Sequence, residues 1–544
     1  MVKYSWRLLQ AIGRSNHWCN ILKSLKRLSP SQSGIGPWYP IRDLEARQIQ
    51  LFKLPHMNPS NLSTSAQEHK PEQSIDALID RINGLTSTTE KFAPLEAIRP
   101  KPLTEPMLEP VRRNETRAKL DSDFNDGFVP KEPQTLAEAR VSGAMVEELI
   151  SKFLSARGES SIRKISQQIG LPFALVEPII TKMKQEQLLG YIDQATMNDY
   201  ICRLTESGRE RAMRYNQSCT YFGSAPVALE DYIASVKAQT ITKQNPTKAD
   251  LERAFSDLLI APQMMRKLGP AVNSGRGMFL FGYPGNGKTS IAERITAAFG
   301  PYVWIPRAIT VDRDIIRVFD PMQHTEANVD ETQGVLNSVS FDRRWVRIKR
   351  PTIVVGGELT MEHLEIQYNP LTGISEAPVQ MKSNTGLLLI DDFGRQRMSV
   401  DELLNRWIVP LEKRYDYLNT SNGKKVQVPF DQLVVFSTNL EPKDLVDDAF
   451  LRRIPYKIEV ENPSTENFVK LFAIMCKAMK VEFKPELIQY LLQTHYFPNN
   501  RPLRNCHPRD LLLQVINFCK YNKIPTEMTK ETLDFACENY FSVM

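Results

Sequence analysis

Residues 277–299 read GMFLFGYPGNGKTSIAERITAAF. The stretch opens with an apolar segment from Met278 to Phe281, and the residues from Gly282 to Thr289 then match G-x-x-x-x-G-K-[ST]. A helical segment follows. This order of strand, glycine-rich loop and helix is the setting in which such a loop binds phosphate. The sequence therefore predicts a phosphate-binding loop followed by a helix that begins at Lys288.

The residue types of this loop suit a nucleotide bound with Mg²⁺. Gly285 and Gly287 permit backbone conformations that direct amide groups at phosphate oxygens, and the following helix adds its positive end. We expect Lys288 to reach the β and γ phosphates and the Thr289 hydroxyl to bind Mg²⁺. The residues of the loop that we expect to bind nucleotide are Gly282, Pro284, Gly285, Asn286, Gly287, Lys288, Thr289 and Ser290.

A second stretch, LLLIDDFGR from Leu387 to Arg395, allows two interpretations. It contains the D-F-G of protein kinases, but the other kinase signatures (G-x-G-x-x-G-x-V, V-A-I-K and H-R-D) do not occur in the chain. The alternative is a Walker B motif, a buried parallel strand that ends in carboxylates, and the phosphate loop favours it. We expect Asp391 to hold Mg²⁺ and its water shell, and Asp392 to orient or deprotonate the attacking water.

Length, composition and charge limit the number of domains and the kinds of partner that the chain can have. The 544 residues are too many for one core and indicate two to four domains. Seven basic residues precede the first acid, Asp43, and removing them from the net charge of +6 leaves −1, so a strongly basic nucleic-acid-binding body is excluded. The seven cysteines form no C-x-x-C pair, which indicates free thiols in the cytoplasm. No apolar run approaches the ~18 residues of a membrane helix, so no membrane partner is expected.

The first part of the chain, residues 1–137, is rich in proline and poor in apolar periodicity, which predicts a mostly disordered arm and linker. A short helix is expected in SIDALIDRINGL, residues 74–85. The basic, acid-free start has two interpretations: an organelle transit segment, or a disordered tail with Met57 as one possible true start. The lack of an amphipathic repeat favours the tail.

Residues 138–216 have a different pattern. MVEELISKFLSAR, SIRKISQQIG and LPFALVEPIITKMKQEQ predict three helices, and a two-stranded wing and LTESGRERA follow, so the segment resembles a winged-helix module. Such modules often place the third helix in the DNA major groove. Here that helix offers Lys182 and Lys184 but also Glu177 and Glu186, and it has no arginine. Protein docking is the favoured alternative.

From about residue 220 to residue 544, the two motifs and the segments after them resemble the AAA+ ATPases. The resemblance implies a doubly wound parallel sheet with a helical lid. It also implies that Asn439, after DQLVVFST, contacts the γ-phosphate or the water. The family usually ends Walker B in D-E, whereas this chain has D-D, so Asp392 is one methylene shorter and slow turnover is compatible with it.

The same resemblance implies two arginine roles. Arg452 or Arg453, in DDAFLRRIPYKIEV, would reach the ATP of a neighbouring subunit, and the position of Arg453 directly before Ile454 favours Arg453. Arg509, in HPRD, would link the nucleotide state to the lid, with Arg501 and Arg504 as weaker candidates. Between the Walker motifs lies a β-rich insert, in which Tyr368 and Leu371 are candidates for contact with a substrate chain; an ordinary surface loop is the alternative.

The combination of a winged helix with GGEL, EAPVQMK, IDDFGRQR and LNRWIVPLEKR resembles a bacterial group described as predicted ATPases with chaperone activity. The expected domains are therefore the arm (1–137), the winged-helix-like domain (138–216), the ATPase core (217–461) and the lid (462–544). The expected reaction is hydrolysis of ATP with Mg²⁺ by a homo-oligomer that remodels a protein client, and a ring, with a hexamer as the candidate size, is the expected assembly. The alternatives are a nucleic-acid-linked ATPase, such as a helicase loader or transcription regulator, and a slow nucleotide switch.

Overall fold

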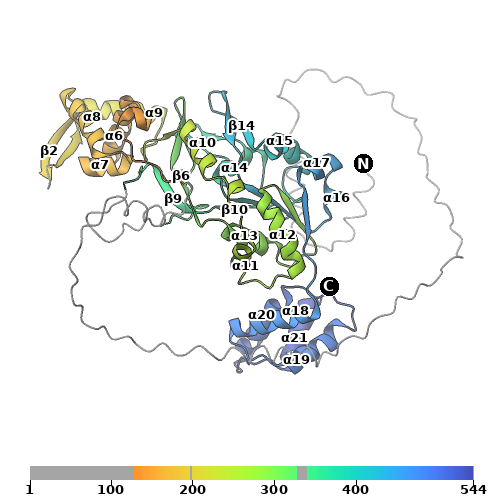
Figure 1. The fold of residues 1–544 in the computed structure, drawn as a ribbon. Coiled ribbons are helices and arrows are strands. Elements are labelled where there is room, and N and C mark those ends of the chain that lie inside the picture. The colour runs from red at the N-terminus through yellow and green to blue at the C-terminus, as the bar shows by residue number, and fades with distance from the viewer. Residues whose placement is uncertain (1–127, 196–198, 328–339, 543–544) are drawn as a thin grey trace, which may run out of the picture. The chain divides into compact units, whose positions relative to one another are not determined.

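The structure is a computed structural model that describes residues 128–195, 199–327 and 340–542 (Figure 1). The predictions for residues 1–127, including the arm, the short helix at 74–85 and the transit segment, lie outside the described residues. Among the described helices, none combines the length and the apolar character needed to cross a membrane.

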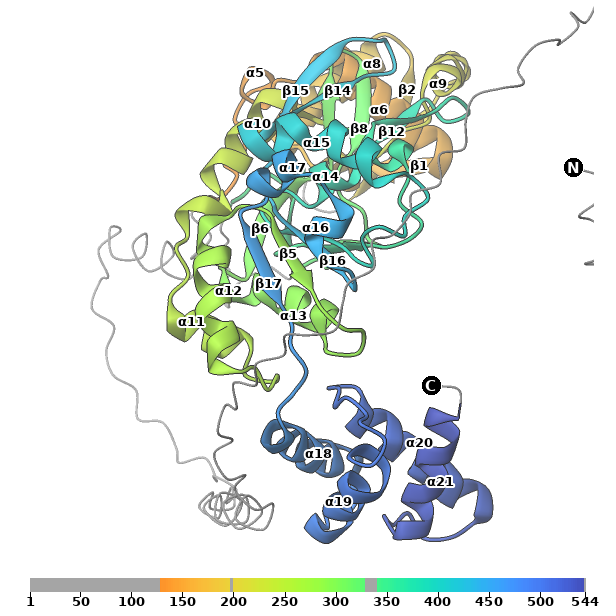
Figure 2. The ribbon, with the colours of Figure 1, turned by 90° about the vertical axis from the view of Figure 1, so that its right-hand side faces the viewer.

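A parallel sheet of five strands forms the centre of the ATPase core. Its spatial order is β10 (Thr352–Val355), β13 (Leu387–Ile390), β16 (Leu433–Thr438), β5 (Met278–Phe281) and β17 (Tyr456–Glu459). Figure 2 shows β5 and β17 side by side. The strands predicted before the phosphate loop and before Asp391 have the predicted bounds. β13 pairs with β10 and β16 at its edges, and its alternate side chains are buried in the two cores on either side of the sheet, which explains its uniformly apolar sequence.

Alternate residues of these strands face two separate cores. Met278 and Leu280 pack with helices on one side of the sheet, whereas Phe279 packs with helices on the other side. The first side is covered by α11 (Lys248–Ala254), α12 (Pro262–Ser274) and α13 (Lys288–Ile295), and the second by α14 (Val379–Lys382), α15 (Val400–Lys413) and α17 (Asp448–Arg453). The prediction of a doubly wound α/β core is confirmed.

The β-rich insert predicted between the Walker motifs forms a second sheet and a strand pair. The sheet has the order β11 (Gln367–Asn369), β12 (Ile374–Glu376), β8 (Asp314–Arg317), β7 (Ala308–Val311) and β4 (Val227–Ala228). β6 (Tyr302–Pro306) pairs with β9 (Trp345–Lys349), and a hairpin of β14 (Tyr415–Asn419) and β15 (Lys425–Pro429) precedes β16. The short elements between these strands are α10 (Leu229–Ala238), Ile241–Lys243, Thr296–Ala298, Met361–Leu364 and α16 (Pro442–Leu445).

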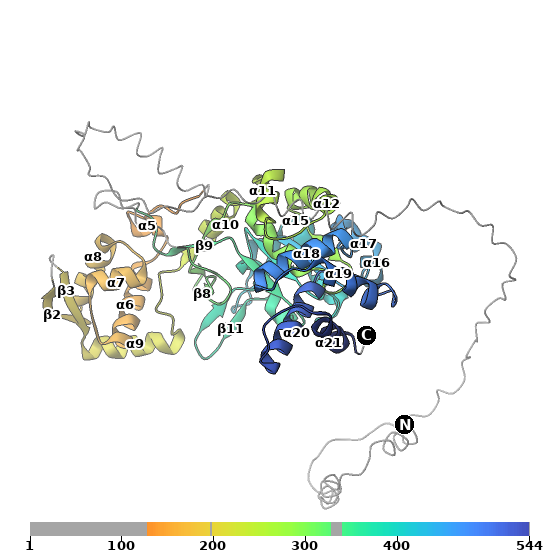
Figure 3. The ribbon, with the colours of Figure 1, turned by 90° about the horizontal axis from the view of Figure 1, so that it is seen from below.

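The segment predicted to be a winged helix contains helices and a small antiparallel sheet (Figure 3). Its elements are α5 (Leu136–Ala139), α6 (Gly143–Arg157), β1 (Glu159–Ser161), α7 (Ile162–Ile169), α8 (Phe173–Gln185), β2 (Leu189–Ala195), β3 (Asp199–Leu204) and α9 (Glu206–Ser218). Gly170 ends α7 in a left-handed conformation, with φ of 72°. Upstream, Phe128 and Val129 pack against Trp304 and Trp345, so residues just before the expected domain boundary contact the insert.

The C-terminal residues form the helical unit expected as a lid (Figure 2). Its elements are α18 (Thr465–Met479), α19 (Pro485–Leu491), a π-helical turn (Leu492–Tyr496), α20 (His507–Asn522) and α21 (Lys530–Phe541). Phe468, Leu511 and Leu533 belong to one buried cluster, which draws residues from α18, α20 and α21 together. The lid therefore has a hydrophobic core of its own.

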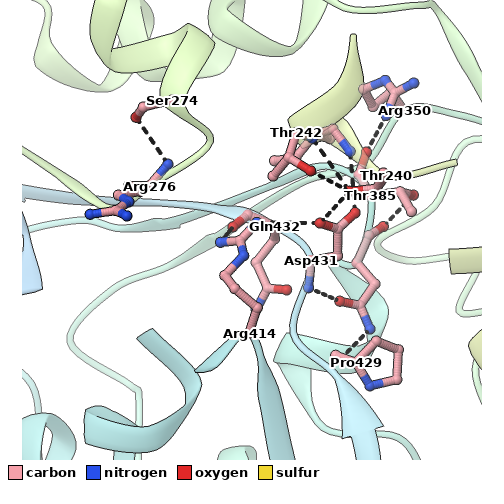
Figure 4. Close-up of polar contacts among 12 residues, drawn as sticks. Thr240, Thr242, Ser274, Arg276, Arg350, Thr385, Arg414, Pro429, Asp431 and Gln432 are labelled. Carbon is pink, nitrogen blue, oxygen red and sulfur yellow. Dashed lines mark hydrogen bonds and ion pairs between the residues drawn. The ribbon is translucent and has the colours of Figure 1, made fainter. Parts of the chain in front are cut away.

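Polar side chains gather at the amino end of the parallel sheet, just before β13 and β16 (Figure 4). We call Thr240, Thr385, Arg414 and Asp431 the basal cluster. The Asp431 carboxylate accepts hydrogen bonds from Thr240 Oγ1 at 2.8 Å, from the Ile241 amide at 3.2 Å and from Arg414 Nη2 at 3.3 Å. The Asp431 carbonyl accepts from the Thr385 amide at 2.6 Å. These hydrogen bonds therefore link the segments at residues 240–241, 385 and 414 to Asp431 at the amino end of the sheet.

Candidate nucleotide-binding site

The predicted phosphate loop lies between β5 and α13, at the carboxyl end of the parallel sheet. Two of its glycines are required by the backbone. Gly282 has φ of 132°, and a Cβ there would lie 2.6 Å from the Val460 carbonyl oxygen; Gly287 has φ of 84° directly before α13. A side chain would clash at Gly282, and at Gly287 the left-handed backbone disfavours one although the space is open, so glycine at both positions suits the conformation that brings the loop to the N-terminus of α13.

Lys288 is the buried cation of this loop. Only 7% of the residue is exposed, and Nζ donates to the Gly282 carbonyl at 2.9 Å, the Tyr283 carbonyl at 3.2 Å and Asn439 Oδ1 at 2.7 Å. Burial lowers the Lys288 pKa, an effect that Asp391 and Asp392 oppose. Among the described residues, the direct partners of Nζ are neutral oxygens, so the charge is left for an incoming anion.

The carboxylates after β13 meet the loop directly. Thr289 Oγ1 donates to Asp391 Oδ2 at 2.7 Å, and Asn439 Nδ2 donates to Asp392 Oδ1 at 3.2 Å. Asn439 also accepts from Lys288, so one amide group joins the lysine to Asp392. The structure thus brings together the residues predicted from three separate motifs.

The oxygen donors of Thr289 and Asp391 fit Mg²⁺, which prefers oxygen ligands and is usually held by one or two carboxylates together with substrate phosphates. No group of three or more His, Cys, Asp or Glu side chains suited to a metal occurs in the described part of the chain. The donor set therefore fits a metal ion that arrives with a nucleotide, rather than a metal site built by protein ligands alone.

A cavity of about 1060 Å³ opens at these residues. The predicted residues Pro284, Gly285, Asn286, Gly287, Lys288, Thr289, Ser290, Asp391, Asp392, Asn439 and Arg509 all line it. One wall is apolar and includes Leu258, Ile260, Met264 and Met475. Polar groups at one end and an apolar wall at the other suit a phosphorylated ligand with an aromatic base. The apolar wall was not predicted, because its residues come from the loop before α12, from α12 itself and from α18, which are far apart in the sequence.

Three asparagines join the phosphate loop to the lid. Asn286, only 1% exposed, donates through Nδ2 to Asn462 Oδ1 at 2.8 Å, and its carbonyl accepts from Asn505 Nδ2 at 3.0 Å. The Cys506 amide donates to the Gly285 carbonyl at 2.9 Å. Asn462 and Asn505 were missed by sequence reasoning, because single asparagines in the lid carry no recognisable pattern. Through these contacts, residues of the lid form hydrogen bonds directly with the backbone of the phosphate loop.

The arginines predicted for the lid lie in different places. Arg509 lines the cavity and pairs with Asp510 at 2.9 Å, whereas Arg504 donates to the Pro284 carbonyl at 3.3 Å. Arg501 instead stacks on Phe541 at 3.7 Å from the ring centroid. Of the three candidates, Arg509 is therefore the cavity-lining one, Arg504 touches the phosphate loop, and Arg501 belongs to the lid core.

The two arginines at the end of α17 differ in their partners. Arg453 donates through Nε to Glu412 Oε1 at 2.7 Å and through Nη1 to the Ala449 carbonyl at 3.0 Å. Arg452 is exposed, and its side chain makes no hydrogen bond or ion pair with any residue that the structure describes. Neither arginine lines the cavity of its own subunit. Arg453 is held against α15, and Arg452 is available to another molecule.

The insert candidates Tyr368 and Leu371 lie on the β11–β12 hairpin. Leu371 is 90% exposed at the loop, and Tyr368 is half-exposed on β11. The same loop contacts the segment after α9, because the Thr220 amide donates to the Thr372 carbonyl at 2.8 Å. Contact of these side chains with a substrate chain stays a prediction.

The parallel sheet, the phosphate loop after β5 and the carboxylates after β13 together form a P-loop core of the kind expected from the resemblance described above. Residues 464–539, in the lid, match a family described as "Domain of unknown function (DUF8689)". No curated protein matches the sequence.

Solved structures with a similar arrangement include NtrX from Brucella abortus in complex with ATP. The TM-score is 0.33 and the identity 14%, over 54% of this chain and 62% of that chain, so less than two thirds of the NtrX chain is spanned. A second is the RuvB Holliday junction branch migration motor of Thermotoga maritima, with a TM-score of 0.31 and 13% identity over 53% of this chain and 73% of that chain.

Proposed function

We propose that the protein binds ATP with Mg²⁺ and hydrolyses it to ADP and phosphate. The observation that carries the proposal is the meeting of Lys288, Asn439 and Asp392 through one amide group, at the edge of a cavity that the phosphate loop also lines. A buried lysine next to loop amides is a phosphate-binding arrangement, and a carboxylate beside it supplies a base for water.

In the proposed reaction, the loop amides and Lys288 hold the β and γ phosphates, and Thr289 and Asp391 would hold Mg²⁺. The metal would neutralise phosphate charge when bound. Asp392 orients the attacking water and accepts its proton, while Asn439 holds both Asp392 and Lys288 in place. Arg509 couples nucleotide binding to the position of the lid, because it lies at the start of α20 and lines the cavity.

We further propose that the active form is a homo-oligomer, in which Arg452 of one subunit completes the site of the next. Arg452 is exposed and has no partner among the described residues, whereas Arg453 is held by Glu412. An arginine supplied in this way neutralises charge in the transition state and increases the rate by ~10³–10⁵ in enzymes that use one. A closed ring, for example of six subunits, would present such an arginine to every site.

The work performed is proposed to be remodelling of a protein or protein complex. The third helix of the winged-helix-like domain, α8, supports a protein partner over DNA. Lys182 pairs with Glu186 at 3.6 Å, and Lys184 lies over the Tyr191 ring at 3.9 Å. Both lysines of the helix are therefore engaged within the domain, which leaves little free positive charge for phosphate contacts. Binding of duplex DNA with a steep salt dependence would favour the nucleic-acid-linked alternative instead.

The test is the rate of phosphate release per mole of full-length protein with Mg-ATP, measured over a range of protein concentrations. We expect the specific rate to rise with concentration for the wild type. Arg452→Ala should remove that rise while leaving ATP binding intact, and Arg453→Ala is the matched control from the same helix. A near-zero rate at every concentration, with ATP bound, would contradict hydrolysis and support the slow nucleotide switch.

A further inference from the structure

Several hydrogen bonds fix the conformation of the turn that follows β13. Asp392 has φ of 48° and Gly394 has φ of 100°, so the chain reverses directly after the Walker B carboxylates. Gln396 Nε2 donates to the carbonyls of Asp391 at 3.1 Å and Asp392 at 3.2 Å, and Gln396 Oε1 accepts from the Gly394 amide at 2.8 Å. One side chain thus satisfies three backbone groups of the turn and fixes its shape.

Contacts of Phe393 with the core also hold this turn in place. Phe393 is fully buried between Phe279 and Phe436, and its amide donates to the Ser437 carbonyl at 2.7 Å. The Arg395 amide donates to the Asp392 carbonyl at 3.0 Å. The backbone of Arg395 is therefore held at a fixed place relative to Asp392, in the same subunit.

Two arginines line the cavity, and they differ in their partners. Arg509 pairs with Asp510 at 2.9 Å. Arg395 is exposed and lines the cavity beside Asp391 and Asp392, but its guanidinium makes no hydrogen bond or ion pair with any residue in the described ranges. A guanidinium with no described partner, in a cavity that Asp391, Asp392 and Lys288 also line, can bind a phosphate with two parallel hydrogen bonds.

We propose that Arg395 binds the terminal phosphate of the nucleotide from within the same subunit, which rests on the proposed function. The terminal phosphate would enter next to Asp391 and Asp392, whose negative charges oppose its own. Lys288 is a single cation and already donates to three neutral oxygens. Arg395 supplies the second positive charge on the Asp392 side, so it distinguishes a triphosphate from a diphosphate.

The test compares the affinities of ADP and a non-hydrolysable ATP analogue, both with Mg²⁺, for the wild type and for Arg395→Ala. Measurements are made on full-length protein at a concentration where sedimentation shows monomers. We expect Arg395→Ala to lose roughly tenfold or more in analogue affinity, as for removal of a charge-assisted hydrogen bond. ADP affinity should stay within about threefold, and Arg395→Lys should recover part of the loss.

The matched control is Arg397→Ala. Arg397 is exposed on the same turn, but it does not line the cavity, and its amide donates to the Gly357 carbonyl at 3.2 Å. Both affinities should match the wild type in this variant. An equal loss for the two nucleotides, no loss at all, or a loss that emerges only in assembled protein would overturn the assignment of Arg395. If the wild type binds neither nucleotide, the proposed function fails together with this inference.

Discussion

The two ends of the parallel sheet both carry charged clusters, yet they differ in what their charges bind. At the amino end, all the hydrogen bonds described for the Asp431 carboxylate come from the protein itself, namely from Thr240, Ile241 and Arg414 (Figure 4). At the carboxyl end, Asp392 is exposed and Lys288 is satisfied by neutral oxygens beside an open cavity. On the proposed function, carboxylates and cations therefore serve stability at one end and ligand binding at the other.

The difference lies in the charge of the partners: the Asp431 carboxylate is paired with Arg414, whereas the three hydrogen bonds of the Lys288 ammonium go to neutral oxygens beside a cavity. Burial lowers the pKa of both cations, Arg414 and Lys288. Asp431 opposes the effect at Arg414 through a direct ion pair, whereas Asp391 and Asp392 oppose it at Lys288 without bonding to Nζ. Substitutions at the two ends should consequently change different properties.

The largest effect is expected from Asp392→Asn. The variant keeps the shape and the contact with Asn439 but removes the proton acceptor, so ATP turnover should fall by about a hundredfold or more. ATP affinity and melting temperature should change little. Turnover at the wild-type rate would show that Asp392 is not the base. Asp391 would then be the next carboxylate to test as the proton acceptor.

Asp431→Ala should have the opposite profile. It leaves the Arg414 guanidinium without its carboxylate and removes the acceptor of Thr240, so the free energy of unfolding should fall by about 3 kcal/mol. Asp431→Asn, which keeps an acceptor but not the charge, should be intermediate. The measurement is chemical denaturation, with ATP affinity measured on the folded variant. A loss of affinity without a loss of stability would mean that the basal cluster also acts on the nucleotide.

The contact between the lid and the phosphate loop should give a smaller effect. Asn505→Ala removes one hydrogen bond to the Asn286 carbonyl, worth about 1 kcal/mol, so a fluorescent ADP should dissociate roughly fivefold faster. Asn522→Ala, at an exposed asparagine that ends the following helix, α20, is the control. Equal dissociation rates in the two variants would show that Asn505 does not help to retain the nucleotide.

The effect that is smallest near neutral pH is a pH dependence of stability. Burial, with help from Arg504 and Arg501 and against Asp510, lowers the pKa of His507 from 6.5 to about 4. Between these values the unfolded chain binds a proton that the folded lid does not, so stability should decline as the pH falls from 6.5 towards 4 and be constant above 6.5. Melting curves of the wild type and His507→Gln test this, because the variant should lose that part of the decline. A decline of the same size in both would assign it to other groups.

Local motifs allowed much of the core and of the site to be predicted. The strands before Gly282 and Asp391 were bounded by the change from apolar residues to glycine or acid, and both have the predicted ends. Arg395, Asn505 and the apolar wall at Leu258 were missed, because their roles depend on which distant segments meet at the cavity. The choice between Arg452 and Arg453 likewise depended on Glu412, a partner on another helix.

The most direct test of the central claim is a calorimetric titration of Mg-ATP into the wild type and Lys288→Ala, together with their melting temperatures. We predict that the wild type binds one ATP per chain. Lys288→Ala should lose at least about a hundredfold in affinity, since it removes a charge that meets the phosphates directly, while its melting temperature without nucleotide stays close to that of the wild type. Equal binding by the two proteins, or no binding by the wild type, would contradict the assignment of the carboxyl end of the sheet as the nucleotide site.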